Sequence, residues 1–435
     1  MVTWSSCRKD ACLNEACPVI DRKGWGVAAV IVLMLGCSAA HSGGSGAIAL
    51  GFEVETLVDV QSNPTLDKAN PQRLEQASTA LSFGVLTQTR SQQLSLAGGI
   101  SLREADGPGG AVVASGVVDP FMAVKYFRQT RAASFRFDAQ YEEVDLSQTD
   151  PLDVGALLVT GTAKRRLLGA EISLRWREDT PLAFGVLAAA QKVTYQDGMA
   201  IGQGGQALNG TARQKLELMA RLDLTKVSHL TTSLAYRSFQ QESVSGSRES
   251  FLLDAVYHLG RPLGAVKINL GYVATDAGHR LGGSVERDYE FRTSALSVSA
   301  GATRAASGDG FLTGHFAYQI ALPLGAFDVS LQRKIASSDQ DDTEQISTEI
   351  GMRYLIKMTP LDGFQVSIDL AKAKNTLTGL ATINRAVGFS YARELNRDAN
   401  LKIGLRRRDV RDTITGAGHS DEIYLSLTRN FNTHY

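Results

Sequence analysis

The sequence predicts an all-β fold: a single transmembrane antiparallel up-and-down β-barrel of about 18–20 strands. Three observations predict it. Apolar and polar side chains alternate in segments of roughly ten residues along most of the chain. Turn-forming residues separate these segments, and the connections alternate between short and long. The last segment keeps the alternation up to a terminal aromatic residue, Tyr435.

The alternation is clear near the C-terminus. Between residues 364 and 370 the even positions carry Phe364, Val366, Ile368 and Leu370, whereas the odd positions carry Gln365, Ser367 and Asp369. A β-strand points successive side chains to opposite faces. Each segment therefore has one apolar face and one polar face, as a strand between lipid and water requires.

Twenty segments share this period and are expected to be strands: 50–60, 78–89, 92–103, 117–128, 132–144, 164–177, 182–196, 212–224, 228–241, 248–259, 263–275, 284–292, 295–304, 310–321, 325–336, 344–357, 363–374, 380–393, 398–410 and 420–431. Short turns are expected near Arg90, Thr130, Asp179, Lys226, Pro262, Pro323, Pro360 and Asn396. Longer polar loops are expected near 61–77, 104–116, 145–162, 197–211, 276–283, 337–343 and 411–419.

The phase of these connections also tests the strand count. A single strand from Asp288 to Thr303 would put short and long connections out of step at Pro323. A turn near Thr293 restores the alternation and gives an even number of strands, as in single-chain bacterial barrels. This favours 20 strands over 18.

The first 49 residues are predicted to be a cleaved signal peptide, leaving a barrel over 50–435. Arg22 and Lys23 precede an apolar run over 24–36, and Ala47-Ile48-Ala49 forms a cleavage site. Residues 1–18 are interpreted as an over-long start, with translation from Val19. Cys37 lies in a partial lipobox, so lipidation there is an open alternative.

Composition excludes several classes of protein. The 45 basic and 45 acidic residues leave no net charge, which argues against nucleic-acid binding. No apolar run reaches the ~18 residues of a membrane-spanning helix. All four cysteines precede the cleavage site, so the exported part has no disulfide chemistry.

Charged residues on the polar parity are expected to line an aqueous lumen, because a charge facing hydrocarbon is costly. The alternative is that they form cross-strand pairs that stiffen the wall. They are Arg136, Asp138, Glu171, Arg175, Glu217, Arg221, Asp223, Lys267, Asp328, Lys334, Glu349, Arg353, Lys402, Arg406 and Arg408.

Five aromatic residues on the apolar parity each stand a few residues before a short turn. They are Tyr126, Trp176, Tyr257, Tyr354 and Tyr391. This position predicts an aromatic girdle at the periplasmic membrane interface.

The final segment carries Ile423, Leu425, Leu427 and Phe431 on one parity, which continues to Tyr435. With the signal peptide and the alternation, it resembles the bacterial outer-membrane β-barrel superfamily in a porin-like form. The resemblance implies residence in the outer membrane, contact with its lipid and lipopolysaccharide, and recognition of the last strand by the outer-membrane assembly machinery. It names an architecture and no particular porin family.

No catalytic, metal or cofactor site is predicted. None of the seven histidines has a partner at metal-ligand spacing in the sequence. The run Gly202–Ala207 fits a dinucleotide fingerprint but has no helix after it. The acidic run from Asp339 to Glu344 is interpreted as a solvated loop.

Two functions remain open. The first is a passive, porin-like channel for small hydrophilic solutes. The second is a structural or surface-interaction barrel whose extracellular loops bind polysaccharide, lipopolysaccharide or a protein partner. A third interpretation of the two-residue alternation is a soluble secreted β-solenoid or sandwich. The sequence leaves the solute and the oligomeric state undetermined.

Overall fold

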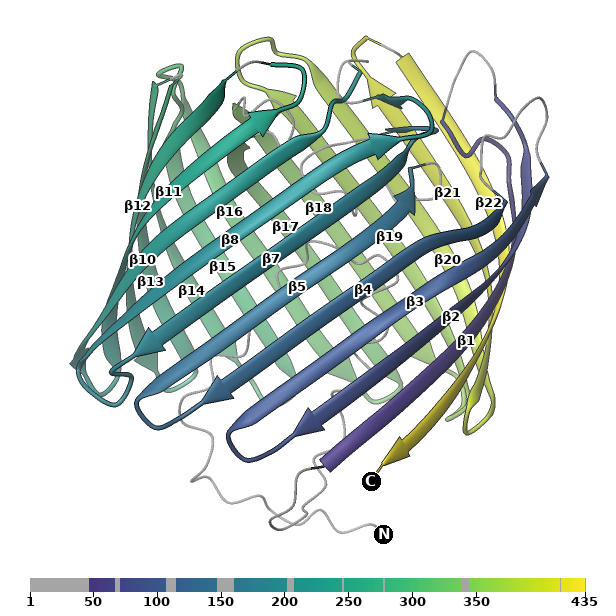
Figure 1. Ribbon diagram of the computed structural model, residues 1–435, viewed down its shortest axis with the longest axis horizontal. Helices are drawn as coiled ribbons and strands as arrows, with labels where there is room; N and C mark the ends of the chain where they lie inside the picture. The colour runs from purple at the N-terminus through teal and green to yellow at the C-terminus, as the bar shows by residue number, and fades with distance from the viewer. Residues whose placement is uncertain are drawn as a thin grey trace.

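The computed structural model describes residues 47–66, 71–106, 115–146, 160–201, 207–244, 246–276, 278–337, 344–414 and 416–434. Their strands form one 20-stranded antiparallel sheet that closes on itself (Figure 1). This confirms the predicted all-β barrel at the upper end of its strand range. The described residues contain no helix long and apolar enough to cross a membrane.

The barrel strands follow one another around the wall in chain order. They are β1 (Ala47–Gln61), β2 (Leu74–Gln88), β3 (Gln92–Asp106), β4 (Gly116–Gln129), β5 (Ala133–Asp145), β7 (Lys164–Trp176), β8 (Leu182–Gln196), β10 (Thr211–Thr225), β11 (Ser228–Gln241), β12 (Ser247–Arg261), β13 (Gly264–Thr275), β14 (Gly278–Glu290), β15 (Ser294–Arg304), β16 (Gly310–Leu322), β17 (Gly325–Ser337), β18 (Glu344–Lys357), β19 (Asp362–Asn375), β20 (Ala381–Asn396), β21 (Ala399–Asp412) and β22 (Gly416–His434).

The first and last strands close the barrel. β1 pairs with β2 on one side and with β22 on the other, so that Phe52 stands opposite both Phe83 and Phe431. Ser426 Oγ also donates a hydrogen bond to Glu55 Oε1 across this seam, at 2.6 Å. Closure leaves the sheet without the unpaired backbone edge that promotes aggregation of open sheets.

Short turns gather at the end of the barrel where β1 begins and β22 ends, the lower edge in Figure 1. All the predicted short turns are present, and the turn expected near Thr293 separates β14 from β15. The opposite end, called the loop end below, is less uniform than predicted. The stretches 276–283 and 411–419 are mostly strand, because β14 begins at Gly278 and β22 at Gly416. Both glycines have positive φ, 135° and 90°, which permits a tight turn.

Two of the expected loops contain a small additional sheet. β6 (Thr160–Gly161) pairs with β9 (Ala200–Ile201) beyond the ends of β7 and β8. Beside it, Leu146, Ala163 and Ala200 form a buried apolar cluster. This pairing extends the wall at the loop end.

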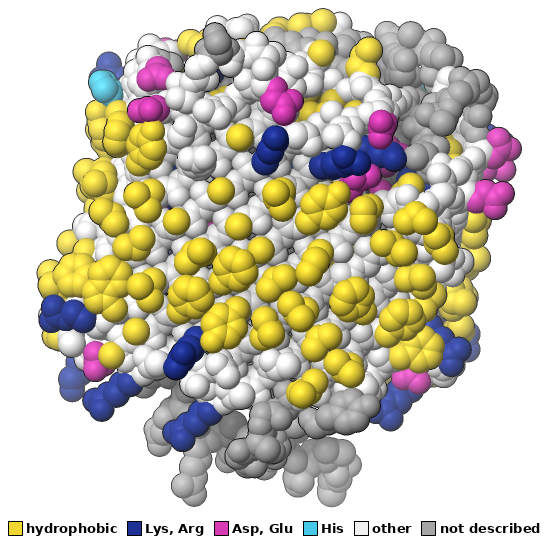
Figure 2. All heavy atoms as spheres, viewed as in Figure 1, with side chains coloured by type: hydrophobic (Ala, Val, Ile, Leu, Met, Phe, Trp, Pro, Cys, Tyr) yellow, Lys and Arg dark blue, Asp and Glu magenta, His cyan; other side chains and the backbone are white. Residues whose placement is uncertain are grey.

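The two faces of the wall differ in chemistry. In Figure 2 hydrophobic side chains form a broad belt around the visible outer surface, with charged side chains above and below it. Leu218 of β10, Leu234 of β11 and Leu270 of β13 are exposed by 51%, 50% and 59%. Large apolar side chains so exposed on strand after strand mark a surface that contacts something other than water.

Residues 1–46 of the predicted signal peptide, which include Val19 and Cys37, lie outside the described residues. Ala47, Ile48 and Ala49, the expected cleavage site, pair with Gln88, Thr87 and Leu86 as the first residues of β1. Cleavage after Ala49 would therefore shorten β1 at its first residues, at the end of the barrel that carries the short turns.

Candidate functional site

The register of the sheet determines which side chains face the interior. Residues opposite each other in an antiparallel pair point to the same face. Starting from the exposed Phe52, this rule puts Glu53 and Glu55 of β1 inside and can be followed from strand to strand around the barrel.

The same rule puts all fifteen charged residues predicted from polar parity on the inner face, opposite the exposed apolar residues. That they line a conducting lumen stays a prediction. The interior site is therefore the inner wall itself rather than one local cluster.

Several inner charges pair along their own strand. Arg136 Nε lies 3.8 Å from Asp138 Oδ2 on β5, and Arg221 Nε donates to Asp223 Oδ1 at 2.8 Å on β10. Lys215 likewise pairs with Glu217 on β10. Because residues two apart on a strand share a face, these pairs lie flat along the inner wall.

Other inner charges join neighbouring strands. Lys267 Nζ of β13 contacts Glu286 Oε1 at 2.7 Å and Asp288 Oδ2 at 2.9 Å on β14. Arg406 Nε of β21 donates to Glu422 Oε2 of β22 at 2.9 Å. Cross-strand charge pairs of the kind that the alternative expects are therefore present, and their effect on the stiffness of the wall stays a prediction.

The remaining inner charges have neighbours of several kinds. Lys334 Nζ lies 3.7 Å from Glu349 Oε1, and Asp328 stands opposite Arg353. Lys402 Nζ lies 5.5 Å from the centre of the Tyr424 ring. Glu171 stands opposite Asp138, and Arg175 opposite Ser134.

A buried polar chain lies at the loop end of the seam. Gln61 Nε2 donates to Asp59 Oδ2 at 2.8 Å, and Arg408 Nη2 donates to Gln61 Oε1 at 2.9 Å. Asp59 and Arg408 are each only 2% exposed. The chain joins β1 to β21 across β22 and places a buried charged layer near this opening.

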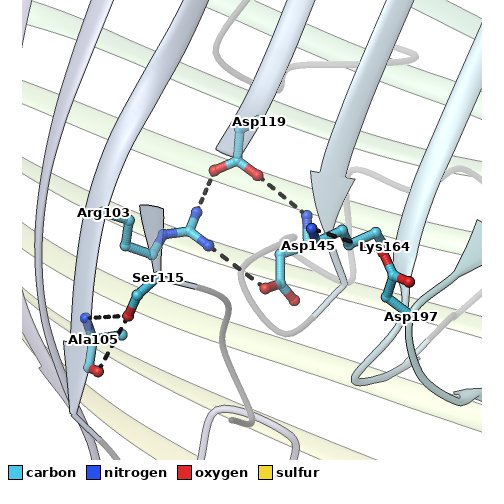
Figure 3. Close-up of polar contacts among 7 residues, drawn as sticks. All are labelled: Arg103, Ala105, Ser115, Asp119, Asp145, Lys164 and Asp197. Carbon is cyan, nitrogen blue, oxygen red and sulfur yellow. Dashed lines mark hydrogen bonds and ion pairs between the residues drawn. The ribbon is translucent and has the colours of Figure 1, made fainter. Parts of the chain in front are cut away.

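A second buried junction joins β3, β4 and β5 (Figure 3). The Arg103 guanidinium contacts Asp119 and lies 3.5 Å from Asp145 Oδ2, and the Asp145 backbone N–H donates to Asp119 Oδ1 at 3.3 Å. Asp119 has φ of 52°, where the register between β3 and β4 shifts. Figure 3 also shows Lys164 beside Asp197, 3.8 Å apart.

Sequence reasoning missed this junction and an imidazole pair. His229 and His258 stand opposite each other, with ring centres 4.5 Å apart and planes 15° apart. Only the register brings them together, since 29 positions separate them in the printed numbering. Among the described residues, no group of three His, Cys, Asp or Glu side chains is arranged to hold a metal ion.

The five predicted girdle aromatics all lie on the outer face. Four have aromatic neighbours on an adjacent strand, namely Tyr126 with Phe135, Trp176 with Phe184, Tyr354 with Phe327 and Tyr391 with Phe364, at centroid distances of 6.0, 5.9, 6.2 and 5.0 Å. Their placement at a membrane interface stays a prediction.

No family model and no curated protein matches this chain. Solved structures that match include the ferric enterobactin receptor PfeA of Pseudomonas aeruginosa, at 10% identity and TM-score 0.46, covering 90% of this chain and 81% of that one. A BenF-like porin from Pseudomonas fluorescens Pf-5 matches at 10% identity and TM-score 0.43, covering 88% and 99%. OpdK of Pseudomonas aeruginosa, solved with vanillate, matches at 12% identity and TM-score 0.42, covering 89% of this chain and 99% of that one. With TM-scores this low, the assignment of the barrel stands on the strand pairing of this chain.

Proposed function

We propose that the barrel spans a bacterial outer membrane and forms a passive channel for small hydrophilic solutes. One observation carries this proposal, the opposite chemistry of the two faces of each strand. On β10, Leu218 is exposed outward, whereas Glu217 and Arg221 point inward. A charged side chain on the lipid face costs roughly 2–4 kcal/mol near the bilayer centre, so this division suits lipid outside and water inside.

The size of the barrel supports a channel. Barrels of about 16–18 strands leave an aqueous channel, and those of about 22 strands hold a plug. Twenty strands fall between these classes. At this strand number we expect a lumen wide enough for small solutes, with its effective width decided by side chains and loops.

The paired charges on the wall bear on selectivity. Acids and bases alternate at short range, as at Lys267 with Glu286 and Arg406 with Glu422. A passing ion meets both signs at close spacing. We expect the channel to select by solute size more than by the sign of charge.

Cysteine modification tests the channel directly. Ser233 and Leu234 are neighbours on β11, facing inward and outward. All four natural cysteines lie within residues 1–37. A barrel over 50–435 carrying Ser233→Cys or Leu234→Cys therefore has one thiol.

A charged, membrane-impermeant thiosulfonate reagent should lower the conductance of the Ser233→Cys barrel in a planar bilayer. The Leu234→Cys barrel serves as the matched control and should not respond. Equal responses, or none from Ser233→Cys despite confirmed labelling in detergent, would contradict the channel. A folded barrel without any permeability would favour the surface-interaction function instead.

A further inference from the structure

Exposed basic residues gather on the outer face of β19, β20 and β21, just above the apolar belt at the loop end. This set, called the outer basic row, consists of Lys372, Lys374, Arg385, Arg407 and Arg411, all of them exposed. Its strands lie on the far wall in Figure 1.

The register places three members side by side. Arg385 of β20 stands opposite Leu370 of β19 and Asp409 of β21. Lys372 and Arg407 each lie two positions from these partners and so are diagonal neighbours of Arg385. Diagonal neighbours on one face are about 7–8 Å apart, so the long side chain of Arg385 can share a tetrahedral anion with Lys372 on one side or with Arg407 on the other.

The height of the row is fixed by the apolar residues next to it. Toward the end of the barrel that carries the short turns, the outward residue next to Arg385 is Val387, which is 50% exposed. The outward residue next to Arg407 in the same direction is Leu405, which is 51% exposed. Leu370 is likewise the outward residue next to Lys372 in this direction. The cations therefore begin where the belt ends, the level at which lipid headgroups would contact the wall.

Acidic side chains compensate the row only in part. Arg407 lies 3.5 Å from both Asp409 and Asp421. In the described part of the chain, Lys372 and Arg385 have no ion pair of their own. Five cations thus face two carboxylates on this sector of the outer wall.

Other sectors at the same end differ. The outer face of β2 and β3 ends in Glu75, Glu104 and Asp106, which are acidic. On β7, Arg166 contacts Glu143 and Lys164 lies near Asp197. These two sectors therefore lack the excess of positive charge found on the outer basic row.

We propose that the outer basic row binds the phosphate groups of a lipid in the outer leaflet, specifically the diphosphorylated lipid A of lipopolysaccharide. The proposal rests on the membrane orientation given under Proposed function. Arginine forms paired hydrogen bonds to phosphate, and lysine adds a point charge. The adjoining apolar wall accommodates the acyl chains of the same molecule.

Native mass spectrometry of the purified barrel in detergent tests this, with diphosphoryl lipid A as the probe. The double variant Lys372→Gln/Arg385→Gln should bind it roughly 30-fold more weakly, from about 1 kcal/mol per basic residue near a membrane surface. Lys192→Gln is the matched control, because Lys192 is an exposed outward cation on β8. It should bind like the wild type.

Dephosphorylated lipid A should bind the wild type no better than it binds the double variant. Wild-type affinity in the double variant would overturn the proposal. So would a loss of roughly 5-fold in Lys192→Gln, the share of one basic residue, since that indicates adsorption over the whole rim. Both variants should keep wild-type conductance in bilayers without lipopolysaccharide. A barrel that binds lipid A but does not conduct would refute the channel alone.

Discussion

At the scale of single residues, Arg103 shows how a charge is kept inside this wall. Its side chain is only 5% exposed and reaches carboxylates on two other strands, Asp119 and Asp145. A buried charge is tolerated when it is paired, and removing one partner leaves the other uncompensated.

Replacing Arg103 by Met should therefore destabilise the barrel by about 3–5 kcal/mol, because the buried Asp145 and the partly buried Asp119 lose their cation. The free energy of unfolding in detergent, from tryptophan fluorescence in guanidinium, measures this. Arg73→Gln is the control, since Arg73 pairs with Glu75 while both are largely exposed. It should cost less than about 1 kcal/mol. Equal effects would show that the Arg103 junction is not stabilising.

The sequence predicted which charged residues face inward because parity is a local property. It could not predict that Arg103 contacts Asp119 and Asp145, or that His229 stacks on His258. Those contacts depend on register between strands, and a shift of one residue would abolish them.

At the scale of elements, each barrel strand has one apolar face and one polar face. The two-residue period predicted all twenty, and the alternation of short and long connections predicted the turn near Thr293. The small β6–β9 pairing and the early start of β14 were missed. Segments of two residues carry no period, and the residues from Gly278 to Gly283 contain too few apolar side chains to show one.

Neighbouring positions on one strand should respond oppositely to the same new charge. Leu218→Arg should destabilise the barrel in a bilayer by roughly 2–4 kcal/mol, because Leu218 faces outward between Leu234 and Val186. Met219→Arg, on the inner face, should have a much smaller effect. Folding titrations into lipid vesicles measure both, and a reversed order would place lipid on the wrong face.

The connections should also differ in accessibility. An epitope inserted at Thr293, in the turn between β14 and β15, should be hidden from antibody on intact cells, because short turns of such barrels face the periplasm. The same epitope at Ser307, between β15 and β16, should be accessible. Permeabilised cells provide the control in which both are stained. Staining of Thr293 alone on intact cells would invert the orientation.

At the scale of the whole molecule, closure of the sheet separates an interior from the surroundings of the barrel. Pairing of β1 with β22 completes a wall whose outer side is apolar (Figure 2) and whose inner side carries charge pairs such as Lys267 with Glu286. The sequence predicted which face of each strand is polar, but it did not predict the side-chain contacts in the interior near the loop end. The buried chain through Asp59, Gln61 and Arg408 forms only when the two ends of the sequence meet.

The most direct test is the conductance of the refolded wild-type barrel in a planar lipid bilayer. A water-filled lumen predicts discrete current steps that grow in proportion to salt concentration, with a reversal potential near zero in a salt gradient because charges of both signs are paired on the wall. Protein that is shown to be folded and inserted yet gives no current above the bare bilayer would contradict the channel.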